Sequence, residues 1–284
     1  MEKIAVMTDT NSSITTEESK KFGIYLSQMP FTIDGEEYIE DVNCTYDEFC
    51  ERLDNGAEVS TAQPALGDLL NTWDEILKEY DKLIYIPMSS ALSGSCETAM
   101  GMARDYEGRV LVVDNKRISI SQRRAALDAL VMIERGMSAE DIKTYLENDS
   151  YNSSIYLAVN TLDLLKKSGR VTATAATIAT IMNIKPVLQI QGGKLDSYAK
   201  ERGMKKAEKI MLHAIEQDQE KRFSQGNSRI YAAYSGNRAE GEEWLKTVQD
   251  FFKDPTIELF RLPISIVCHV STGVHAIGIM GHLS

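Results

Sequence analysis

Features that would indicate several other kinds of protein are scarce or missing in this sequence. Its 284 residues include four cysteines, none in a CxxC pair: Cys44, Cys50, Cys96 and Cys268. We therefore expect neither a disulfide framework nor a cysteine-based metal site. No apolar run approaches the roughly 20 residues that a membrane-spanning helix needs, so no transmembrane segment is expected.

Basic residues are too few for a protein that binds nucleic acid. The formal net charge is −11, whereas the phosphates of DNA and RNA require a basic protein face. The first residues, MEKIAVMTDT, lack the charged start and the long apolar core of a signal peptide. Together with the unpaired cysteines, this predicts a cytoplasmic protein.

The stretch from Leu83 to Glu97, LIYIPMSSALSGSCE, carries the clearest binding signal. Residues 83–86 have the length and flanks of a buried parallel strand, and helix-compatible residues begin at Cys96. The turn between them directs backbone N–H groups and hydroxyls to one point, where the start of a helix favours an anion. An ordinary helix cap needs one serine, whereas this turn has four: Ser89, Ser90, Ser93 and Ser95. We interpret it as a binding loop, because ligands of open α/β sheets gather at the carboxyl ends of strands.

Two further polar segments also lie directly after a predicted strand or shortly before a predicted helix. A predicted first strand, Ile4–Thr8, is followed by a polar loop from Asp9 to Ser13. Thr61 comes shortly before a predicted helix, for which Pro64 suits the first turn.

The order of the predicted elements indicates two domains. Strands and helices alternate through residue 150, which predicts a parallel sheet covered by helices. Asp34-Gly35 favours a tight hairpin, which we predict to be an insertion at about 28–41. The second half mixes helices, a hairpin across 191–193 and further strands, including one at 264–269. We therefore predict a doubly wound α/β domain at 1–152 and an α+β domain at 153–284, with a ligand pocket between them.

Six motifs, spread over most of the chain, occur in the order typical of one known family. They are MTDTNSSI at the start, Thr61-Ala-Gln-Pro, the serine-rich turn 89–95, Val113-Asp-Asn115, Leu165–Arg170 (LKKSGR), and Asn183–Val187 (NIKPV) followed by Gly193-Lys194. With these motifs the sequence resembles the DegV family. Each motif is weak alone, but six in the right order are specific.

The sequence departs from the family pattern at two places. Ala62 replaces the second residue of the family's TSQP motif. Near the C-terminus the family usually has a histidine followed closely by a GPG-type turn. Here the segment 268–273 keeps His269 but has a serine and a threonine before its glycine, and His275 follows as a second candidate.

The resemblance implies a carrier rather than an enzyme, because the studied DegV proteins are the fatty-acid-binding subunits of bacterial fatty acid kinase. It implies a bound long-chain fatty acid, of the palmitate, stearate or oleate class, with no cofactor, no metal and no catalytic residue. A separate ATP-dependent kinase would form an acyl phosphate, and the chain has no GxxxxGK[ST] motif of its own. The implied carboxylate ligands are Thr61, Ser93 and His269, supported by Asp9, Ser12, Ser90, Gly94, Ser95 and Gly273.

A basic cluster and a segment of small residues have less specific interpretations. From the sequence alone, Arg170, Arg202, Lys205 and Lys206 suggest solvated surface. The resemblance implies that Arg170 and Arg202 contact the kinase or the transferred phosphate. Thr172–Met182 is rich in small residues and indicates a closely packed helix, or a lining for the acyl chain.

Two alternatives from other functional classes stay open at this point. Ser93 is a candidate nucleophile of a hydrolase or acyltransferase, with His269 or His275 as its base, although the chain has no GxSxG motif. The serine-rich loops also suit a binder of small anions or phosphosugars.

Overall fold

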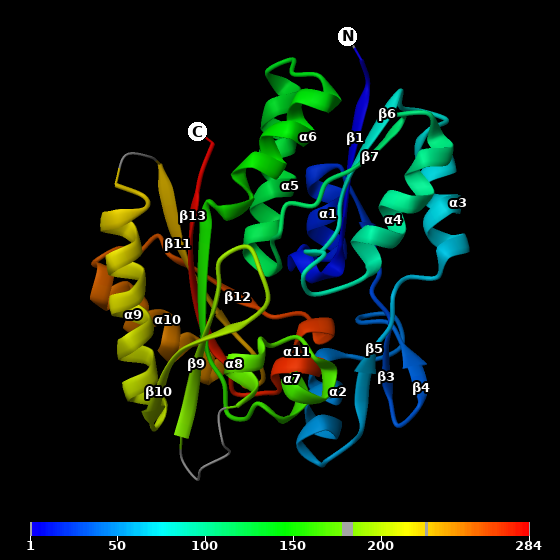
Figure 1. Ribbon diagram of the computed structural model, residues 1–284. Helices are drawn as coiled ribbons and strands as arrows, with labels where there is room; N and C mark the ends of the chain where they lie inside the picture. Colours follow the sequence, from blue (N-terminus) through cyan, green and yellow to red (C-terminus); the bar gives the residue numbers. More distant parts are fainter. Residues whose placement is uncertain (1, 178–183, 225–226, 284) are drawn as a thin grey trace. The chain divides into compact units, whose positions relative to one another are not determined.

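The chain divides into two compact units in the computed structural model, which describes residues 2–177, 184–224 and 227–283 (Figure 1). The N-terminal unit comprises Met1–Pro30, Thr61–Tyr151 and Leu283, and the C-terminal unit comprises Phe31–Ser60 and Asn152–His282. The sequence-based division at residue 152 assigns 31–60 to the first domain. Hydrogen bonds between residues far apart in the chain connect the segment 31–60 to the rest of the C-terminal unit. No local sequence pattern indicates these hydrogen bonds.

The N-terminal unit is built on a parallel sheet with strand order β2-β1-β6-β7. Alternate residues of each strand point to opposite faces, and both faces are buried. Ile4 and Val6 pack with residues from the segment 125–146, whereas Ala5 and Met7 pack with residues from the segments 69–77 and 96–99. This confirms the predicted doubly wound α/β arrangement. The strands are β1 (Ile4–Asp9), β2 (Ile24–Ser27), β6 (Lys82–Ile86) and β7 (Val110–Val112).

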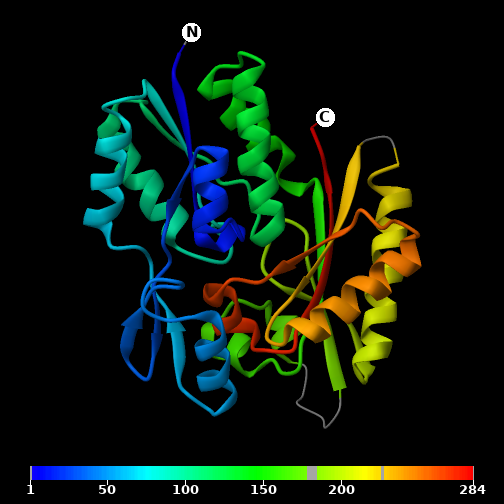
Figure 2. The ribbon, with the colours of Figure 1, turned by 180° about the vertical axis from the view of Figure 1, so that it is seen from behind.

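Helices cover both faces of this sheet (Figures 1 and 2). One face carries α1 (Thr16–Phe22), α5 (Ser119–Glu134) and α6 (Ala139–Asn148), and the other carries α3 (Leu66–Ile76) and α4 (Ser95–Ala103). The capping box predicted at Thr15 is confirmed, because the Thr15 hydroxyl accepts the N–H of Glu18 and the Glu18 carboxylate accepts the N–H of Thr15.

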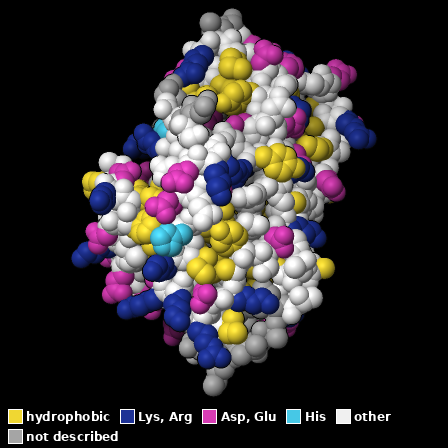
Figure 3. Space-filling view, turned by 60° about the vertical axis from the view of Figure 1, so that its left-hand side comes forward, with side chains coloured by type: hydrophobic (Ala, Val, Ile, Leu, Met, Phe, Trp, Pro, Cys, Tyr) yellow, Lys and Arg dark blue, Asp and Glu magenta, His cyan; other side chains and the backbone are white. Residues whose placement is uncertain are grey.

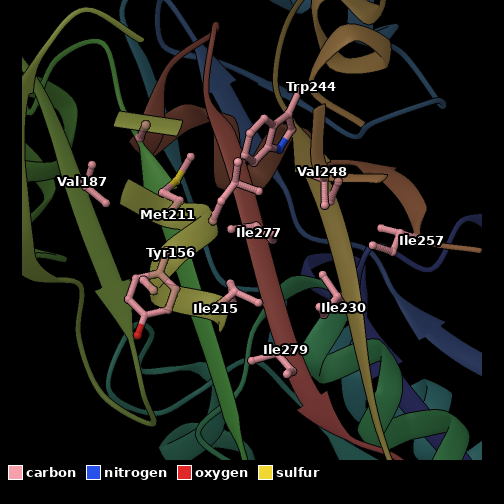
Figure 4. Packing of buried hydrophobic residues seen from close by; sticks show 14 of the residues in the cluster. Tyr156, Val187, Met211, Ile215, Ile230, Trp244, Val248, Ile257, Ile277 and Ile279 are labelled. Atoms are coloured by element: carbon pink, nitrogen blue, oxygen red, sulfur yellow. The ribbon is translucent and has the colours of Figure 1, made fainter. Parts of the chain in front are cut away.

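The C-terminal unit is built on a mixed sheet with strand order β10-β9-β8-β13-β11-β12. Only β11 and β12 pair in parallel. One face packs against α9 (Met204–Lys221) and α10 (Arg238–Phe252) (Figure 4). There Trp244 donates its indole N–H to the Ala276 carbonyl at 2.9 Å. The strands are β8 (Ser153–Ala158), β9 (Ile184–Ile190), β10 (Asp196–Arg202), β11 (Ser228–Tyr234), β12 (Glu258–Arg261) and β13 (His275–Gly281). The predicted hairpin across 191–193 is confirmed as β9 and β10.

Smaller elements complete the description. A three-stranded sheet has the order β4-β3-β5, and its β3–β4 hairpin turns at Asp34-Gly35 as predicted. These elements are β3 (Phe31–Ile33), β4 (Glu36–Tyr38), β5 (Val59–Thr61), α2 (Tyr46–Asp54), α7 (Asp163–Ser168), α8 (Ala173–Ala176) and α11 (Ile264–Val270). Of the predicted lining Thr172–Met182, the residues from 178 onward lie outside the described part of the chain, as does Asn183 of the NIKPV motif.

The prediction of a strand at 264–269 is wrong, because this apolar run forms helix α11. A short run of buried apolar residues does not distinguish strand from helix, and the surroundings decide. The strand β13 was not predicted, since its glycines weaken the strand pattern. One of them, Gly278, leaves room for the neighbouring strand, because a Cβ there would meet the Ser154 carbonyl oxygen at 3.3 Å.

Candidate functional site

The carboxyl edge of the parallel sheet has one topologically special position. The chain passes from β1 to β2 on one side, whereas β6 lies on the other side of β1. Open α/β sheets bind their ligands at such a switch point, outside the carboxyl ends of the strands. The loops that follow β1 and β6 are the two polar loops that the sequence singled out.

A buried carboxylate joins these two loops. Asp9 Oδ2 accepts the N–H of Met88 at 2.8 Å, and Oδ1 accepts the N–H of Asn11 and the Nε2–H of Gln122, both at 3.0 Å. Asp9 is fully buried. Burial raises its pKa, and the hydrogen bonds from Met88, Gln122 and Asn11 oppose that shift. Asp9 therefore fixes the geometry of the loops.

Two of the predicted supporting serines hold the loops from within. Ser12 donates its hydroxyl to the Asp9 carbonyl at 2.7 Å. Ser90 donates to Asp114 Oδ2 at 2.6 Å and accepts from Lys116 Nζ at 2.5 Å, while Lys116 also bonds to Asp114. These hydroxyls are therefore engaged within the protein.

Ser93 stands at the start of helix α4. Its Oγ accepts the N–H of Ser95 at 3.2 Å and lies 3.0 Å from Ser95 Oγ. Ser95 is buried and is the first residue of the helix, whereas Ser93 is half-buried. The Ser93 hydroxyl thus lies at the end of the helix that carries partial positive charge.

The loop that contains Thr61 lies beside the Ser93 loop. A Cβ placed on Gly94 would lie 3.1 Å from Nε2 of Gln63, so the residues directly after Ser93 and shortly after Thr61 are in contact range. Thr61 itself is half-buried and ends β5. Helix α3 begins at Leu66, so the expectation that Pro64 lies in its first turn is wrong. The structure therefore brings together the segments that carry two of the three predicted ligands.

The third predicted ligand, His269, lies in the C-terminal unit on α11. Burial, and to a smaller extent the nearby positive charge of Arg170, lower its pKa to about 4. The ring is therefore neutral at pH 7, where one nitrogen donates a hydrogen bond and the other accepts one. The structure thus places the predicted Arg170 close to His269.

The alternative histidine has partners inside the C-terminal unit. His275 Nδ1 lies 2.6 Å from Glu208 Oε1. Its ring stacks on Trp244, with ring centroids 5.5 Å apart and planes inclined by 5°. His275 therefore takes part in the packing of β13 against α9 and α10. The predicted Gly273 has a positive φ of 69° and donates its N–H to the Ser235 carbonyl at 3.0 Å.

The two predicted arginines lie apart. The Arg170 carbonyl accepts the N–H of Leu195, the residue before β10, whereas Arg202 ends that seven-residue strand. The rise of a strand makes this separation about 20 Å. Arg202 belongs instead to the basic end of α9, which we define as five exposed side chains: Lys200, Arg202, Lys205, Lys206 and Lys209.

The basic end of α9 has no acidic partner, since none of its side chains forms an ion pair within the described ranges. Figure 3 shows dark blue side chains along the lower left of one molecular face. Two of the lysines lie in the first turn of α9, where the helix dipole disfavours positive charge. An anionic partner would relieve that repulsion.

The described residues contain neither a candidate metal site nor a candidate membrane span. No group of three or more His, Cys, Asp or Glu side chains there is arranged to hold a metal ion. No helix in that part of the chain has both the length and the apolar character needed to cross a membrane.

Comparison with known proteins identifies the family. Residues 3–282 match the profile of the family described as "Uncharacterised protein, DegV family". This chain belongs to the DegV family. A DegV domain-containing protein of Staphylococcus aureus is 30% identical to it over 196 residues, which are 69% of this chain and 70% of the relative. Another, from Clostridium perfringens, is 27% identical over 291 residues, covering 99% of this chain and 98% of the relative.

Solved structures of DegV proteins have the same fold over almost the whole chain. A Thermus thermophilus protein, described by its fatty acid binding, superimposes with a TM-score of 0.87 at 26% identity and covers 98% of this chain and 99% of its own. Bacillus subtilis DegV, described as a fatty acid binding protein, gives 0.84 at 26% identity, with 99% and 100% covered. A Streptococcus agalactiae DegV protein gives 0.88 at 24% identity, with both chains fully covered.

Replacing Asp9 by asparagine should destabilise the N-terminal unit. The substitution replaces one carboxylate oxygen by an NH2 group. Both oxygens of Asp9 accept from N–H donors, so in either orientation of the asparagine amide a buried N–H loses its acceptor. We expect a loss of about 1–3 kcal/mol in the free energy of unfolding, measured by denaturant titration. The exposed Asp105→Asn variant is the control and should change it by less than about 0.5 kcal/mol. Equal effects of the two variants would contradict the role of Asp9.

Replacing Arg170 by glutamine should raise the pKa of His269. The raised value should stay below the ordinary 6.5, because burial, the larger cause, remains. Because the pKa of His269 is lower in the folded than in the unfolded protein, the unfolded chain binds a proton at higher pH. The contribution of His269 to the free energy of unfolding therefore decreases as the pH falls from about 6.5 towards 4. NMR titration of the imidazole measures the pKa. The control Arg202→Gln should leave it unchanged, and a null effect of Arg170→Gln would contradict the assignment.

Proposed function

We propose that this protein binds a long-chain fatty acid and holds its carboxylate with Thr61, Ser93 and His269. The observation that carries the proposal is the contact of the Thr61 and Ser93 loops at the topological switch point of the sheet. The two relatives at 26% identity that are described as fatty acid binding support it.

The proposed site suits a carboxylate because its donors are neutral and directed. A carboxylate taken out of water needs hydrogen-bond donors, or it becomes protonated. The Ser93 hydroxyl at a helix start, the Thr61 hydroxyl and a neutral histidine supply O–H and N–H groups without a buried charge of their own. Each hydrogen bond to the charged group contributes about 1.5–3 kcal/mol.

A row of apolar residues in the C-terminal unit is the proposed surface for the acyl chain. Strand register aligns Ala233 with Ala276, Ala276 with Leu157, and Leu157 with Leu188. The residues next to them in sequence pack on α9 and α10, so this row belongs to the opposite face. All four are buried. Each CH2 group that such a surface removes from water contributes about 0.8 kcal/mol.

The finer proposal is that the protein presents this carboxylate to a separate kinase. The kinase would transfer the γ-phosphoryl group of ATP to a carboxylate oxygen, giving an acyl phosphate and ADP. Because the proposed reaction consumes ATP, we propose a cytoplasmic location. The basic end of α9 supports docking of an acidic partner surface, and Arg170, close to His269, suits the transferred phosphate.

No observation favours Ser93 as a nucleophile. Its hydroxyl donates to Ser95, which is not a base, at 3.0 Å. The carrier proposal therefore assigns to Ser93 a ligand-binding hydroxyl and no covalent step.

Thr61→Val and Ser93→Ala should each weaken fatty acid binding. Each change removes one hydroxyl donor to the carboxylate, so we expect the Kd to rise about 10- to 100-fold. Calorimetric titration with oleate measures this. Thr247→Val, on the exposed side of α10, is the matched control and should bind as the wild type does. Unchanged affinity in both site variants, or purified protein from which mass spectrometry recovers no fatty acid, would refute the proposal.

Arg202→Ala should impair the kinase reaction without affecting the ligand. It removes one charge from the basic end of α9, so we expect the KM of a bacterial fatty acid kinase for the loaded carrier to rise several-fold. The Kd for oleate should not change. The exposed Arg238→Ala variant is the matched control. Unaltered acyl phosphate formation by Arg202→Ala at limiting kinase would exclude this docking role.

A further inference from the structure

The helix that carries His269 has little to fix it from its own sequence. Helix α11 has seven residues, and its N-cap residue Pro263 provides no side-chain hydrogen bond. A helix of this length is not stable by itself in water, so its position depends on contacts with the rest of the protein. Contacts at the two ends of α11 can therefore determine its position.

Two carboxylates from a distant segment bond at these two ends. Glu40 Oε2 accepts the N–H of Ile264, the first residue of α11, at 2.8 Å. Asp54 Oδ1 accepts the hydroxyl of Thr272, two residues beyond the helix, at 2.5 Å. Both carboxylates belong to the segment Phe31–Ser60, and all of these residues belong to the C-terminal unit. His269 lies between the two points of attachment.

The same segment is itself firmly held in the C-terminal unit. The Tyr46 hydroxyl accepts the N–H of Gly236 at 3.0 Å, and Tyr46 is buried. The guanidinium of Arg261 lies 4.1 Å from the centre of the Tyr46 ring and bonds to Glu40 at 3.2 Å. A fixed support of this kind can impose a position on the helix that it grips.

We propose that Glu40 and Asp54 clamp helix α11 and thereby position His269 for its ligand. This inference rests on the proposed function, in which His269 donates to the carboxylate of a fatty acid. Glu40 and Asp54 act through the helix and do not touch the ligand. They are positioning residues.

The charge of Glu40 gives the clamp a measurable signature. Its pKa is raised to about 7, mainly by burial and slightly by Asp41, against the lowering effects of the Ile264 N–H and Arg261. The other titratable groups that face it are the thiols of Cys44 and Cys268, whose own pKa values are raised, so both stay neutral. Glu40 therefore changes charge near neutral pH, where His269 does not.

A double-mutant cycle tests the clamp. Glu40→Ala removes the acceptor for the Ile264 N–H, so we expect a three- to tenfold rise in the Kd for oleate. Glu40→Gln keeps an acceptor oxygen and should restore binding to within twofold. In a His269→Ala background, Glu40→Ala should have no further effect, because the clamp acts through His269. Additive losses would overturn the proposal.

A second readout needs no ligand. At pH 6, where Glu40 is mostly protonated, the imidazole NMR signal of His269 should move in Glu40→Ala and Asp54→Ala but not in Glu40→Gln. In the wild type it should also shift between pH 6 and 8 as Glu40 titrates, and in Glu40→Gln it should not. Glu58→Ala is the matched control, because Glu58 is an exposed carboxylate of the same segment and pairs with Lys167.

The outcomes separate this inference from the proposed function. If the wild type binds no fatty acid, the proposed function fails, and the NMR signals alone decide whether the clamp exists. If oleate binds and the NMR signal of His269 does not change in the Glu40 and Asp54 variants, the clamp proposal is wrong and the proposed carrier function is unaffected. Should Glu40→Ala not fold, Asp54→Ala, a change at an exposed residue, carries the same comparison.

Discussion

The structure depends on one buried carboxylate at the edge of the parallel sheet. Asp9 accepts donors from its own loop, from the loop after β6 and from α5. Removing such a group from water is costly, and only directed N–H donors compensate for the cost. The two loops are therefore held at the switch point by the requirement to satisfy Asp9, and the position of Ser93 follows from the same requirement.

The same device recurs in both units. In the C-terminal unit, Glu40 and Asp54 accept bonds at the ends of α11. In the N-terminal unit, Asp114 accepts from Ser90 and Lys116. Each carboxylate takes up donors that would otherwise bind water or a ligand. In the proposed function, hydroxyls and a neutral imidazole bind the anionic ligand, while these carboxylates hold the framework around them.

The sequence predicted those elements whose structure depends on interactions between residues close together in the chain. The apolar runs of β1 and β6, the capping box at Thr15 and the hairpin at Asp34-Gly35 depend on neighbouring residues, and all were predictable. The helical structure of α11 was not predictable from the sequence. The N–H of its first residue, Ile264, donates to Glu40, which lies 224 residues earlier in the chain. Long-range bonds of this kind leave no local signal.

The candidate site shows the same division. The serine-rich turn was conspicuous in the sequence, but Gln122 and Lys116, which complete the network around it, were missed. The only signal for Gln122 was a polar residue on a helix whose sheet-facing neighbours are small and apolar. Arg170 and Arg202 were considered together because both are basic, whereas a whole strand separates them.

The net charge of the protein has the same sign as the charge of the proposed ligand. The distance over which each interaction acts explains why the two are compatible. A protein of charge −11 repels an anion at long range, but at physiological ionic strength the repulsion decays over about 8 Å. Within hydrogen-bond distance, donors at a helix start outweigh it. One group of exposed positive charges lies at the basic end of α9, where the proposed function has it meet an acidic partner rather than the small ligand. The proposed function therefore requires that short-range hydrogen bonds select the ligand, while longer-range charge attraction guides the partner.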